Sequence, residues 1–415
     1  MSKPFRLRLS RPHSHSWRSE AMTLNKPEKL ITESPVDRAI RLAPMAAAAA
    51  PESERLRRLA QPLVDALVEA GLFRLLMPAS VGGEEVSPTT FLSVLEVMAN
   101  ADASTAWCLS QTSVCSTAAA SLKLEVAREI FADPGAILAS GFGGGQALLV
   151  SGGHLISGNW SFGSGSRHAT WLAGSCTLCD AGGTPLRNAN GQPMARMMLF
   201  PQGMATFSET WEVMGLKGTG SDSYAVSELF VPESHSFQFG ALAQPHARSP
   251  LYALPPDSLW AGGFGSASLG VAQGMLDALI ALAQEKTVRG QKRPLSESPV
   301  VQALVAEADA RLRAARMLLH GTFSEVWAAM QSSGTIDLAQ RVSIRLAASH
   351  AIQEAKTVVE QCYHAAGTSA VFTSAPFERR FRDMHMISQH LHGRRAHFET
   401  VGQFMLGLSP DVVFL

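Results

Sequence analysis

Long segments rich in Ala, Leu and Arg occupy the C-terminal part of the 415-residue chain and constrain its fold more than any other feature. Breaks rich in Gly, Pro and Ser separate them, and each segment is longer than the average helix of a globular protein. The segments are residues 266–285, 300–330, 337–366 and 377–408. Four long antiparallel helices bury their apolar stripes against one another. This part of the chain is therefore predicted to form a four-helix bundle.

Two parts of different character precede this bundle. Residues 28–134 show the apolar spacing of three or four that is typical of helices. Residues 135–248 are rich in Gly and contain short alternating apolar runs, bounded by prolines such as Pro201 and Pro232, which is typical of β-strands. Residues 249–415 hold the bundle. The predicted fold class is α+β, with an N-terminal helical domain, a middle β-barrel or β-sandwich domain and a C-terminal four-helix bundle.

The first 27 residues are left outside this fold. Residues 1–21 hold five basic side chains and no acid before Glu20, which superficially resembles a transit peptide. Because Met22 follows directly, we interpret the segment as a disordered extension or as the product of a start codon assigned too far upstream.

Charge and cysteine content exclude several classes of protein. The 35 Lys and Arg balance the 35 Asp and Glu, so the net charge is zero. A chain without net positive charge has no long-range attraction to phosphate backbones, and no nucleic-acid partner is predicted. We find no apolar run of the roughly 20 residues that a bilayer requires, and predict no membrane span. Five cysteines are an odd number in a long chain, which favours reduced thiols and a cytoplasmic location.

Three patterns suggest ligand sites, and each is better explained otherwise. The Gly runs at 141–145 and 263–265 lack the strand, helix and acid of a dinucleotide fingerprint. Cys176 and Cys179 have the spacing of a zinc knuckle but no second pair, so a β-turn with two small buried residues is favoured. On one continuous helix, His390 and His397 would share a face about 10 Å apart, too far for one ion. No metal site is predicted.

Two features remain as candidates. His390 lies at the margin of the apolar stripe of the last predicted helix, where it either packs with a hydrogen bond or accepts a proton, since the ordinary histidine pKa is near neutral. Residues 158–171 and 211–221 place Gly and hydroxyl residues between aromatic ones, which suits a flat ring ligand but also suits ordinary strands with Gly bulges.

Motifs spread over residues 28–410 resemble, in order, the acyl-CoA dehydrogenase fold. They are Phe-Arg-Leu-Leu-Met-Pro (73–78) with Gly82-Gly83, Asp-Ala-Ser-Thr-Ala-Trp (102–107), Trp160 to Trp171, Gly-Leu-Lys-Gly-Thr-Gly-Ser (215–221), Val-Pro-Glu (231–233) and Arg-Phe-Arg-Asp (380–383). Within this superfamily the chain most resembles the oxygenase components of two-component flavin-dependent monooxygenases. That group contains p-hydroxyphenylacetate hydroxylase and dibenzothiophene monooxygenase.

One position separates the two branches of the superfamily that the chain resembles. The short- and medium-chain dehydrogenases carry a catalytic Glu after an Arg-Asp pair, and aligning that pair on Arg382 and Asp383 places Leu391 there. Leucine cannot abstract an α-proton. The neighbouring His390 matches a histidine that the oxygenases use, so the resemblance favours the oxygenase.

The resemblance implies a reaction with four participants: reduced FMN, a separate NAD(P)H-dependent flavin reductase that delivers it, O2, and an aromatic or other small organic substrate. A C4a-hydroperoxyflavin would hydroxylate the substrate, with His390 as base or hydrogen-bond partner. Ser164 occupies the position of the superfamily that lies beside flavin N5. FAD is the alternative cofactor.

Further cofactor contacts are implied by the same resemblance. Trp211 would pack near the flavin ring, and Arg289 would meet the phosphate by charge-assisted hydrogen bonds. Thr368 and Ser369, in the loop before the last helix, would reach the flavin of another subunit, which implies a homo-oligomer, expected to be a homotetramer.

The sequence departs from the oxygenase pattern at one place, and two alternative functions stay open. Several oxygenases of this group have a His in the helix after the Asp-Ala-Ser-Thr-Ala-Trp motif, whereas residues 110–120 contain Gln111 and Cys115 but no His. The alternatives are an FAD-dependent acyl-CoA dehydrogenase and a non-catalytic member of the fold that binds no flavin.

Overall fold

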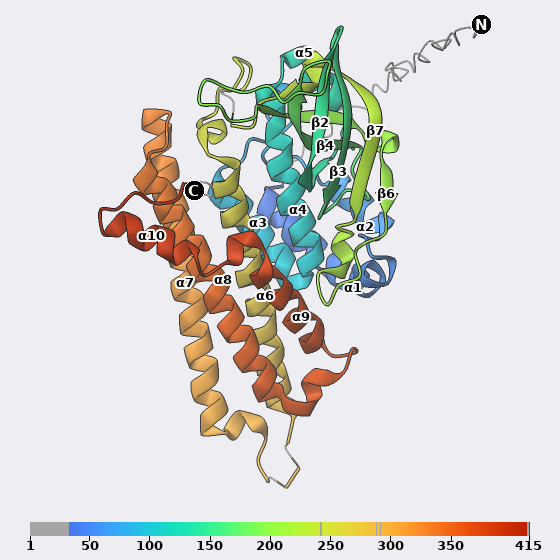
Figure 1. The fold of residues 1–415 in the computed structure, drawn as a ribbon. Coiled ribbons are helices and arrows are strands. Elements are labelled where there is room, and N and C mark those ends of the chain that lie inside the picture. The colour runs from blue at the N-terminus through green and yellow to red at the C-terminus, as the bar shows by residue number, and fades with distance from the viewer. Residues whose placement is uncertain (1–32, 241–242, 288, 291, 413–414) are drawn as a thin grey trace, which may run out of the picture. The chain divides into compact units, whose positions relative to one another are not determined.

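The computed structural model describes residues 33–240, 243–287, 289–290, 292–412 and 415. The predicted extension, residues 1–27, lies outside them. From Glu33 onward the chain forms one compact unit in which helices flank a mixed β-sheet (Figure 1).

The N-terminal part is helical, and three of its helices begin at a capping side chain. Ser34, Ser87 and Asp102 each accept a backbone N–H from the first turn, which satisfies donors that have no partner inside the helix. The elements are α1 (Pro35–Leu56), α2 (Gln61–Glu69), η1 (Ala79–Val81), α3 (Pro88–Ala101), α4 (Ala103–Ser116), η2 (Thr117–Ser121) and α5 (Leu124–Phe131).

The middle part forms one mixed sheet beside α4 (Figure 1). Its strands are β1 (Leu138–Ser140), β2 (Phe142–Val150), β3 (Gly153–Ser161), β4 (Trp171–Cys179), β5 (Ala195–Pro201), β6 (Thr206–Ser208), β7 (Ser223–Pro232) and β8 (Ser236–Phe237). The strand order is β6-β7-β3-β2-β4-β5-β8, and β1 pairs with β4. β4 runs parallel to β1 and β2, while the other pairs are antiparallel.

Trp160 fills the centre of this sheet. Its side chain is fully buried, and its ring packs against that of Tyr224 with centroids 5.6 Å apart. A Cβ atom on Gly158 or Gly174 would lie 2.7 Å or 2.4 Å from the indole. The glycines of this segment therefore make room for Trp160 itself, so at Trp160 the alternative of ordinary strands holds and not that of a flat ring ligand.

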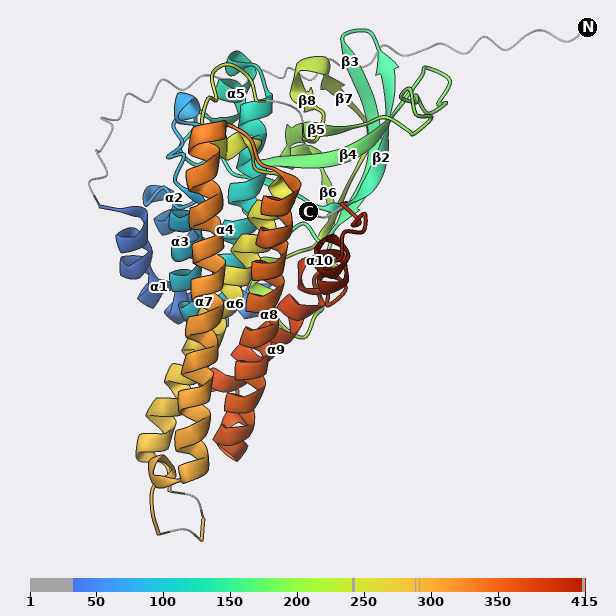
Figure 2. The same ribbon diagram turned by 90° about the vertical axis from the view of Figure 1, so that its left-hand side faces the viewer.

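The C-terminal part consists of long helices that lie side by side (Figure 2). They are α6 (Pro256–Glu285), α7 (Pro299–Ser333), α8 (Leu338–Ala366), α9 (Pro376–Gln389) and α10 (His397–Met405). Short 3-10 turns join the elements: η3 (Gln202–Met204), η4 (Lys217–Thr219), η5 (Glu233–His235), η6 (Pro250–Ala253), η7 (Leu295–Glu297), η8 (Gly367–Val371) and η9 (Leu391–Gly393).

Helix α6 is the core helix of this arrangement and packs against α3, α4, α7, α8 and α9. By length and apolar composition it is the one helix of the described residues that could cross a membrane, yet 67% of its most apolar window is buried inside the protein. Glycines allow the close packing: a Cβ atom on Gly263 would lie 2.4 Å from Ser110 Oγ, and one on Gly262 would meet the Phe323 ring. The glycines at 262, 263 and 265 thus lie inside helix α6, where Gly262 and Gly263 let neighbouring helices approach closely.

The fourth predicted helix, residues 377–408, is interrupted. Helix α9 ends at Gln389, His390 has extended backbone angles (φ −61°, ψ 152°), and α10 begins only at His397. A Cβ atom on Gly393 would lie 2.9 Å from the Ser388 carbonyl oxygen, so only glycine fits the turn that follows. The prediction that His390 and His397 share one face of a continuous helix is therefore wrong.

All five cysteines lie in the described residues and are buried and free. Cys176 and Cys179 lie on strand β4 and not in the predicted turn. No group of three His, Cys, Asp or Glu side chains in residues 33–412, apart from the gaps named above, is placed to hold a metal ion.

Candidate active site

Aromatic rings surround His390. Its ring centroid lies 5.1 Å from that of Trp107 and 4.9 Å from that of Phe264, both in edge-on arrangements. Trp107 and Phe264 stack on each other with centroids 3.8 Å apart. Phe142, whose side chain is 53% exposed, lies 6.2 Å from His390. Helix α4, helix α6 and strand β2 thus converge on the turn that follows α9.

The turn fixes the state of the His390 ring. Its Nδ1 atom accepts the backbone N–H of His392 at 3.4 Å, which leaves the proton of a neutral imidazole on Nε2. Burial, together with the positive charges of Arg394 and Arg345, lowers the pKa of His390 to about 4. The ring is therefore neutral at pH 7 and presents Nε2–H as a donor. The pKa of His390 thus lies below the ordinary value from which we argued, and of its two predicted roles the geometry supports the hydrogen-bond partner.

A buried charged group lies behind this turn. Arg345 on α8 is 1% exposed, and its Nη1 donates to Nδ1 of His392 at 2.9 Å. Nε2 of His392 faces Oδ1 of Asp257 at 3.8 Å. Burial and the charge of Arg345 hold the pKa of His392 well below its usual range, so His392 stays neutral. Arg345 therefore offsets the charge of Asp257 while holding the turn.

Ser164 lies in the loop between β3 and β4 and contacts the same tryptophan as His390. Its Oγ accepts the Trp107 indole N–H at 3.1 Å and lies 2.6 Å from Oγ of Ser221. Gly165 next to it has φ +79°, and a Cβ atom there would lie 3.0 Å from the Thr112 side chain on α4. Trp107 thus bridges the two residues that the sequence singled out for catalysis, Ser164 and His390.

Trp211 lies beside the loop of Ser164. Its indole N–H donates to the Leu216 carbonyl at 3.0 Å, and its ring stands edge-on to Phe162, with centroids 6.0 Å apart. Trp211 is 7% exposed, whereas Phe162 is 59% exposed. Phe162 therefore provides an open aromatic face next to Ser164.

Asp383 ties this loop to helix α9. Its Oδ1 accepts the backbone N–H of Leu216 at 2.6 Å, and Leu216 has the left-handed φ of 52°. Burial raises the pKa of the fully enclosed Asp383 carboxyl to about 7. The Arg-Asp motif on α9 and the 215–221 motif, far apart in sequence, are thus one structural unit.

The remaining predicted contacts lie elsewhere in this chain. Arg289 is exposed in the loop between α6 and α7, Thr368 is exposed and Ser369 is half-buried in η8. Lys286 Nζ donates to the Ala366 carbonyl at 2.7 Å, which places these two segments at the same end of the bundle, remote from the sheet (Figures 1 and 2). The 14 residues of α9, about 21 Å of helix, separate that end from His390. One chain does not bring these residues to Ser164.

The sequence matches two family models of known proteins. Residues 39–122 match the family described as "Acyl-CoA dehydrogenase, N-terminal domain", and residues 262–395 match "Acyl-CoA dehydrogenase, C-terminal domain". Together these matches span more than half of the chain. The chain belongs to the acyl-CoA dehydrogenase superfamily.

Relatives within this superfamily are monooxygenases. Indole-3-acetate monooxygenase of Pseudomonas putida is 28% identical over 86% of this chain and 90% of its own length. The flavin-dependent monooxygenase oxygenase subunit HsaA of Rhodococcus jostii is 28% identical over 81% and 88%. The crystal structure of 3-HSA hydroxylase from Rhodococcus sp. superimposes with a TM-score of 0.83 at 25% identity, covering 92% of this chain and 99% of that one. XiaF from Streptomyces sp., in complex with FADH2 and glycerol, gives 0.82 at 25% identity, with 92% and 97% covered. These comparisons confirm the predicted superfamily and class of enzyme.

Leu391 and His390 are the two residues on which the resemblance separates a dehydrogenase from an oxygenase. Leu391 lies in η9, directly after His390, at the position where the resemblance puts the catalytic Glu of a dehydrogenase. The group that faces Trp107 and Phe264 is the neutral imidazole of His390.

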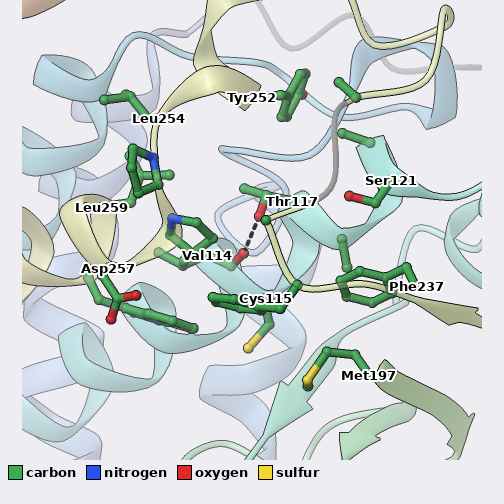
Figure 3. Close-up of a pocket in the computed structure, with 18 of the residues that line it drawn as sticks. Val114, Cys115, Thr117, Ser121, Met197, Phe237, Tyr252, Leu254, Asp257 and Leu259 are labelled. Carbon is green, nitrogen blue, oxygen red and sulfur yellow. Dashed lines mark hydrogen bonds between the residues drawn. The ribbon is translucent and has the colours of Figure 1, made fainter. Parts of the chain in front are cut away.

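A cavity of about 300 Å³ lies further along helix α4 (Figure 3). Cys115, eight residues or about 12 Å beyond Trp107, lines it, and its Sγ lies 3.2 Å from Oγ of Ser140. Burial raises the pKa of Cys115 to about 11, so the thiol stays protonated. In Figure 3, Asp257 and Phe237 lie on opposite sides of the cavity. Other lining residues include Val114, Leu138 and Trp260. Cys115, with Gln111 one turn before it, lies in the helix where the resemblance led us to look for a His.

Sequence reasoning missed several residues of this site. His392 and Arg345 carry no motif, because each acts through a contact with a distant segment. Phe264 lies in the 263–265 run, which was considered only as a dinucleotide fingerprint. Asp257 precedes the apolar run of α6 and gave no signal of its own. Trp107 and Asp383 did belong to quoted motifs, and that position within a motif was the signal that could have identified them.

Proposed function

We propose that this chain is the oxygenase component of a two-component, FMN-dependent monooxygenase that hydroxylates an aromatic or other small organic substrate. A separate NAD(P)H-dependent reductase supplies the reduced flavin, and FAD is the alternative form. The observation that carries the proposal is the imidazole of His390, neutral and flanked by Trp107 and Phe264, at the turn where a dehydrogenase requires a carboxylate. The monooxygenase relatives support it.

The residues present fit a flavin. Ser164 is 6% exposed and has one hydroxyl lone pair that no described residue engages. Phe162, 59% exposed, and Trp211 stand beside it as a platform for a flat ring. Bound in its reduced form, the flavin would supply the electrons that activate O2.

The chain's own residues position the substrate and exclude water. Trp107 and Phe264 form a buried stacked pair that supports the His390 ring, and the exposed Phe142 beside His390 is the ring against which an aromatic substrate can pack. His390 then donates Nε2–H to the oxygen or nitrogen of the substrate that gains charge, because its Nδ1 is already engaged by His392. The Arg345–His392 contact holds the turn in this orientation.

The cavity lined by Cys115 lies about 12 Å along α4 from Trp107, and neither His390 nor Trp107 lines it, so it is a second small-molecule site beside the His390 turn. Its volume of about 300 Å³ lies at the small end of the range for ligand pockets, which favours one or two rings. Cys115 is a protonated thiol there and takes no covalent part in the reaction.

Assembly completes the cofactor site in this proposal. Arg289, Thr368 and Ser369 gather at the end of the bundle that is remote from Ser164, so a second copy of the chain would bring them to the flavin. We propose a homotetramer, which light scattering in solution tests. A monomer that binds flavin with full affinity would contradict it.

Rapid mixing tests the proposed activity. The protein is loaded anaerobically with reduced FMN and mixed with O2, in the presence and absence of a panel of phenols and indoles. We expect a transient absorbance distinct from both the reduced and the oxidised flavin, and hydroxylated product with an accepted substrate. Reduction of bound flavin by an acyl-CoA under anaerobic conditions would instead establish a dehydrogenase. Absence of any flavin binding would establish a non-catalytic protein.

A further inference from the structure

A chain of hydrogen bonds leads away from Ser164 into the protein. Oγ of Ser164 lies 2.6 Å from Oγ of Ser221, which lies 2.7 Å from Oγ1 of Thr219. Oγ1 of Thr219 in turn lies 2.8 Å from the carbonyl oxygen of Leu216. At the other end, the indole N–H of Trp107 reaches Ser164 at 3.1 Å. We call Ser164, Ser221 and Thr219 the hydroxyl chain.

The direction of this chain is set at its inner end, where Thr219 meets the Leu216 carbonyl. The Leu216 carbonyl only accepts, so Thr219 donates its single proton to it, alongside the Trp211 indole N–H and the Thr219 backbone N–H that the same oxygen accepts. Ser221 must then donate to Thr219, and Ser164 must donate to Ser221. Indole N–H only donates, so Trp107 fills one lone pair of Ser164. Ser164 is left with one free lone pair and no free proton.

Burial prevents water from reversing this direction. Ser221 is 2% exposed and Thr219 is 1% exposed, whereas Ser164 keeps 6%. Gly220 between the two inner hydroxyls has φ +53°, and a Cβ atom there would lie 2.5 Å from the Arg57 carbonyl oxygen. The loop is therefore held against α1, and only Ser164 retains access to a ligand.

We propose that Ser221 and Thr219 are positioning residues that hold Ser164 as a hydrogen-bond acceptor and thereby select the redox state of the flavin. This inference rests on the proposed function and on the resemblance, which implies that Ser164 lies beside flavin N5. In a reduced flavin N5 carries a hydrogen and donates, whereas in an oxidised flavin N5 has only a lone pair. The oxidised ring would therefore set its N5 acceptor against the acceptor of a buried hydroxyl.

Equilibrium binding of both redox states tests this proposal. We measure the Kd of oxidised FMN in air and of reduced FMN under anaerobic conditions, for the wild-type protein and for Ser221→Ala. The wild-type protein is expected to bind reduced FMN tighter by about tenfold or more, the scale of one buried acceptor left unpaired. Ser221→Ala releases the Ser164 proton, so oxidised FMN should bind about tenfold tighter and reduced FMN nearly as before. The potential of the bound flavin would fall by about 30 mV for a two-electron couple.

A second variant of the hydroxyl chain and a control variant outside it complete the test. Thr219→Val removes the acceptor of Ser221, so that Ser221 can donate to Ser164 instead. The ratio of the Kd of oxidised FMN to that of reduced FMN should then shift in the same direction as in Ser221→Ala. Either variant alone tests the proposal if the other fails to fold. Ser223→Ala removes a hydroxyl that bonds Ser161 and Thr210 outside the chain, and should leave the ratio unchanged.

Failure of the inference and failure of the proposed function give different results. Equal affinity of the wild-type protein for both redox states, or an unchanged ratio in Ser221→Ala and Thr219→Val, overturns the inference while flavin binding stands. A wild-type protein that binds neither form overturns the proposed function and this inference with it.

Discussion

His390 accepts the backbone N–H of His392 on one ring nitrogen and is left with a donor on the other. This relationship decides what the imidazole can do, because the nitrogen that a base would use is already engaged. It also depends on the break after α9, since only the extended backbone at His390 turns the ring back onto the N–H two residues ahead.

A first prediction concerns His390 itself. His390→Ala removes the donor, and we expect the yield of hydroxylated product per flavin reoxidised to fall about tenfold, the scale of one hydrogen bond to a charged group. Flavin binding should persist. His390→Gln can offer an amide N–H near the position of Nε2 and should recover part of the yield. Unchanged coupling in His390→Ala would remove His390 from the mechanism.

A second prediction concerns the buried charge behind the turn. Arg345→Met leaves His392 without its donor and removes one of the two cations, Arg345 and Arg341, that act on Asp257. We expect the free energy of unfolding in urea to fall by about 2 kcal/mol, the scale of a lost buried hydrogen bond to a charged group. Arg345→Lys should be intermediate, because an ammonium restores the charge without the planar geometry. If Arg345→Met unfolds at the wild-type urea concentration, the network does not hold the turn.

A third prediction uses the pH dependence of Asp383. Its pKa in the folded protein, about 7, lies above the ordinary 3.8, so between these values the folded state binds a proton that the unfolded state lacks. Stability from this group therefore rises as the pH falls from about 8 to about 5. Asp383→Asn cannot titrate, so the wild-type protein should gain stability relative to Asp383→Asn over that range. Parallel stability curves for the two proteins would show that the carboxyl is already ionised in the fold.

A fourth prediction tests the packing of Trp160. Gly174→Ala places a methyl group 2.4 Å from the indole, and we expect unfolding to become easier by about 1–3 kcal/mol. Gly144→Ala in strand β2 is the matched control, because nothing lies within 4 Å of the added Cβ. A change of similar size in both variants would show that strand flexibility, and not the indole, accounts for the effect.

Several features could be predicted from local sequence because they repeat at short range. The apolar spacing of the long C-terminal segments located α7 and α8 closely, and the order of the short motifs identified the superfamily. The branch of the superfamily followed from one pair of neighbours, His390 and Leu391. These features depend on residue type and spacing alone.

The state of each site residue was decided only by the tertiary structure. Burial moved the pKa of His390 to about 4, Trp160 proved to be core and not a ligand wall, and the proton of Ser164 was committed by Leu216 through two other hydroxyls. Ionisation, exposure and hydrogen-bond direction depend on which distant segments exclude water and which groups they offer as partners. A sequence supplies the imidazole and the hydroxyl, whereas the packed fold decides which of their atoms carry a proton.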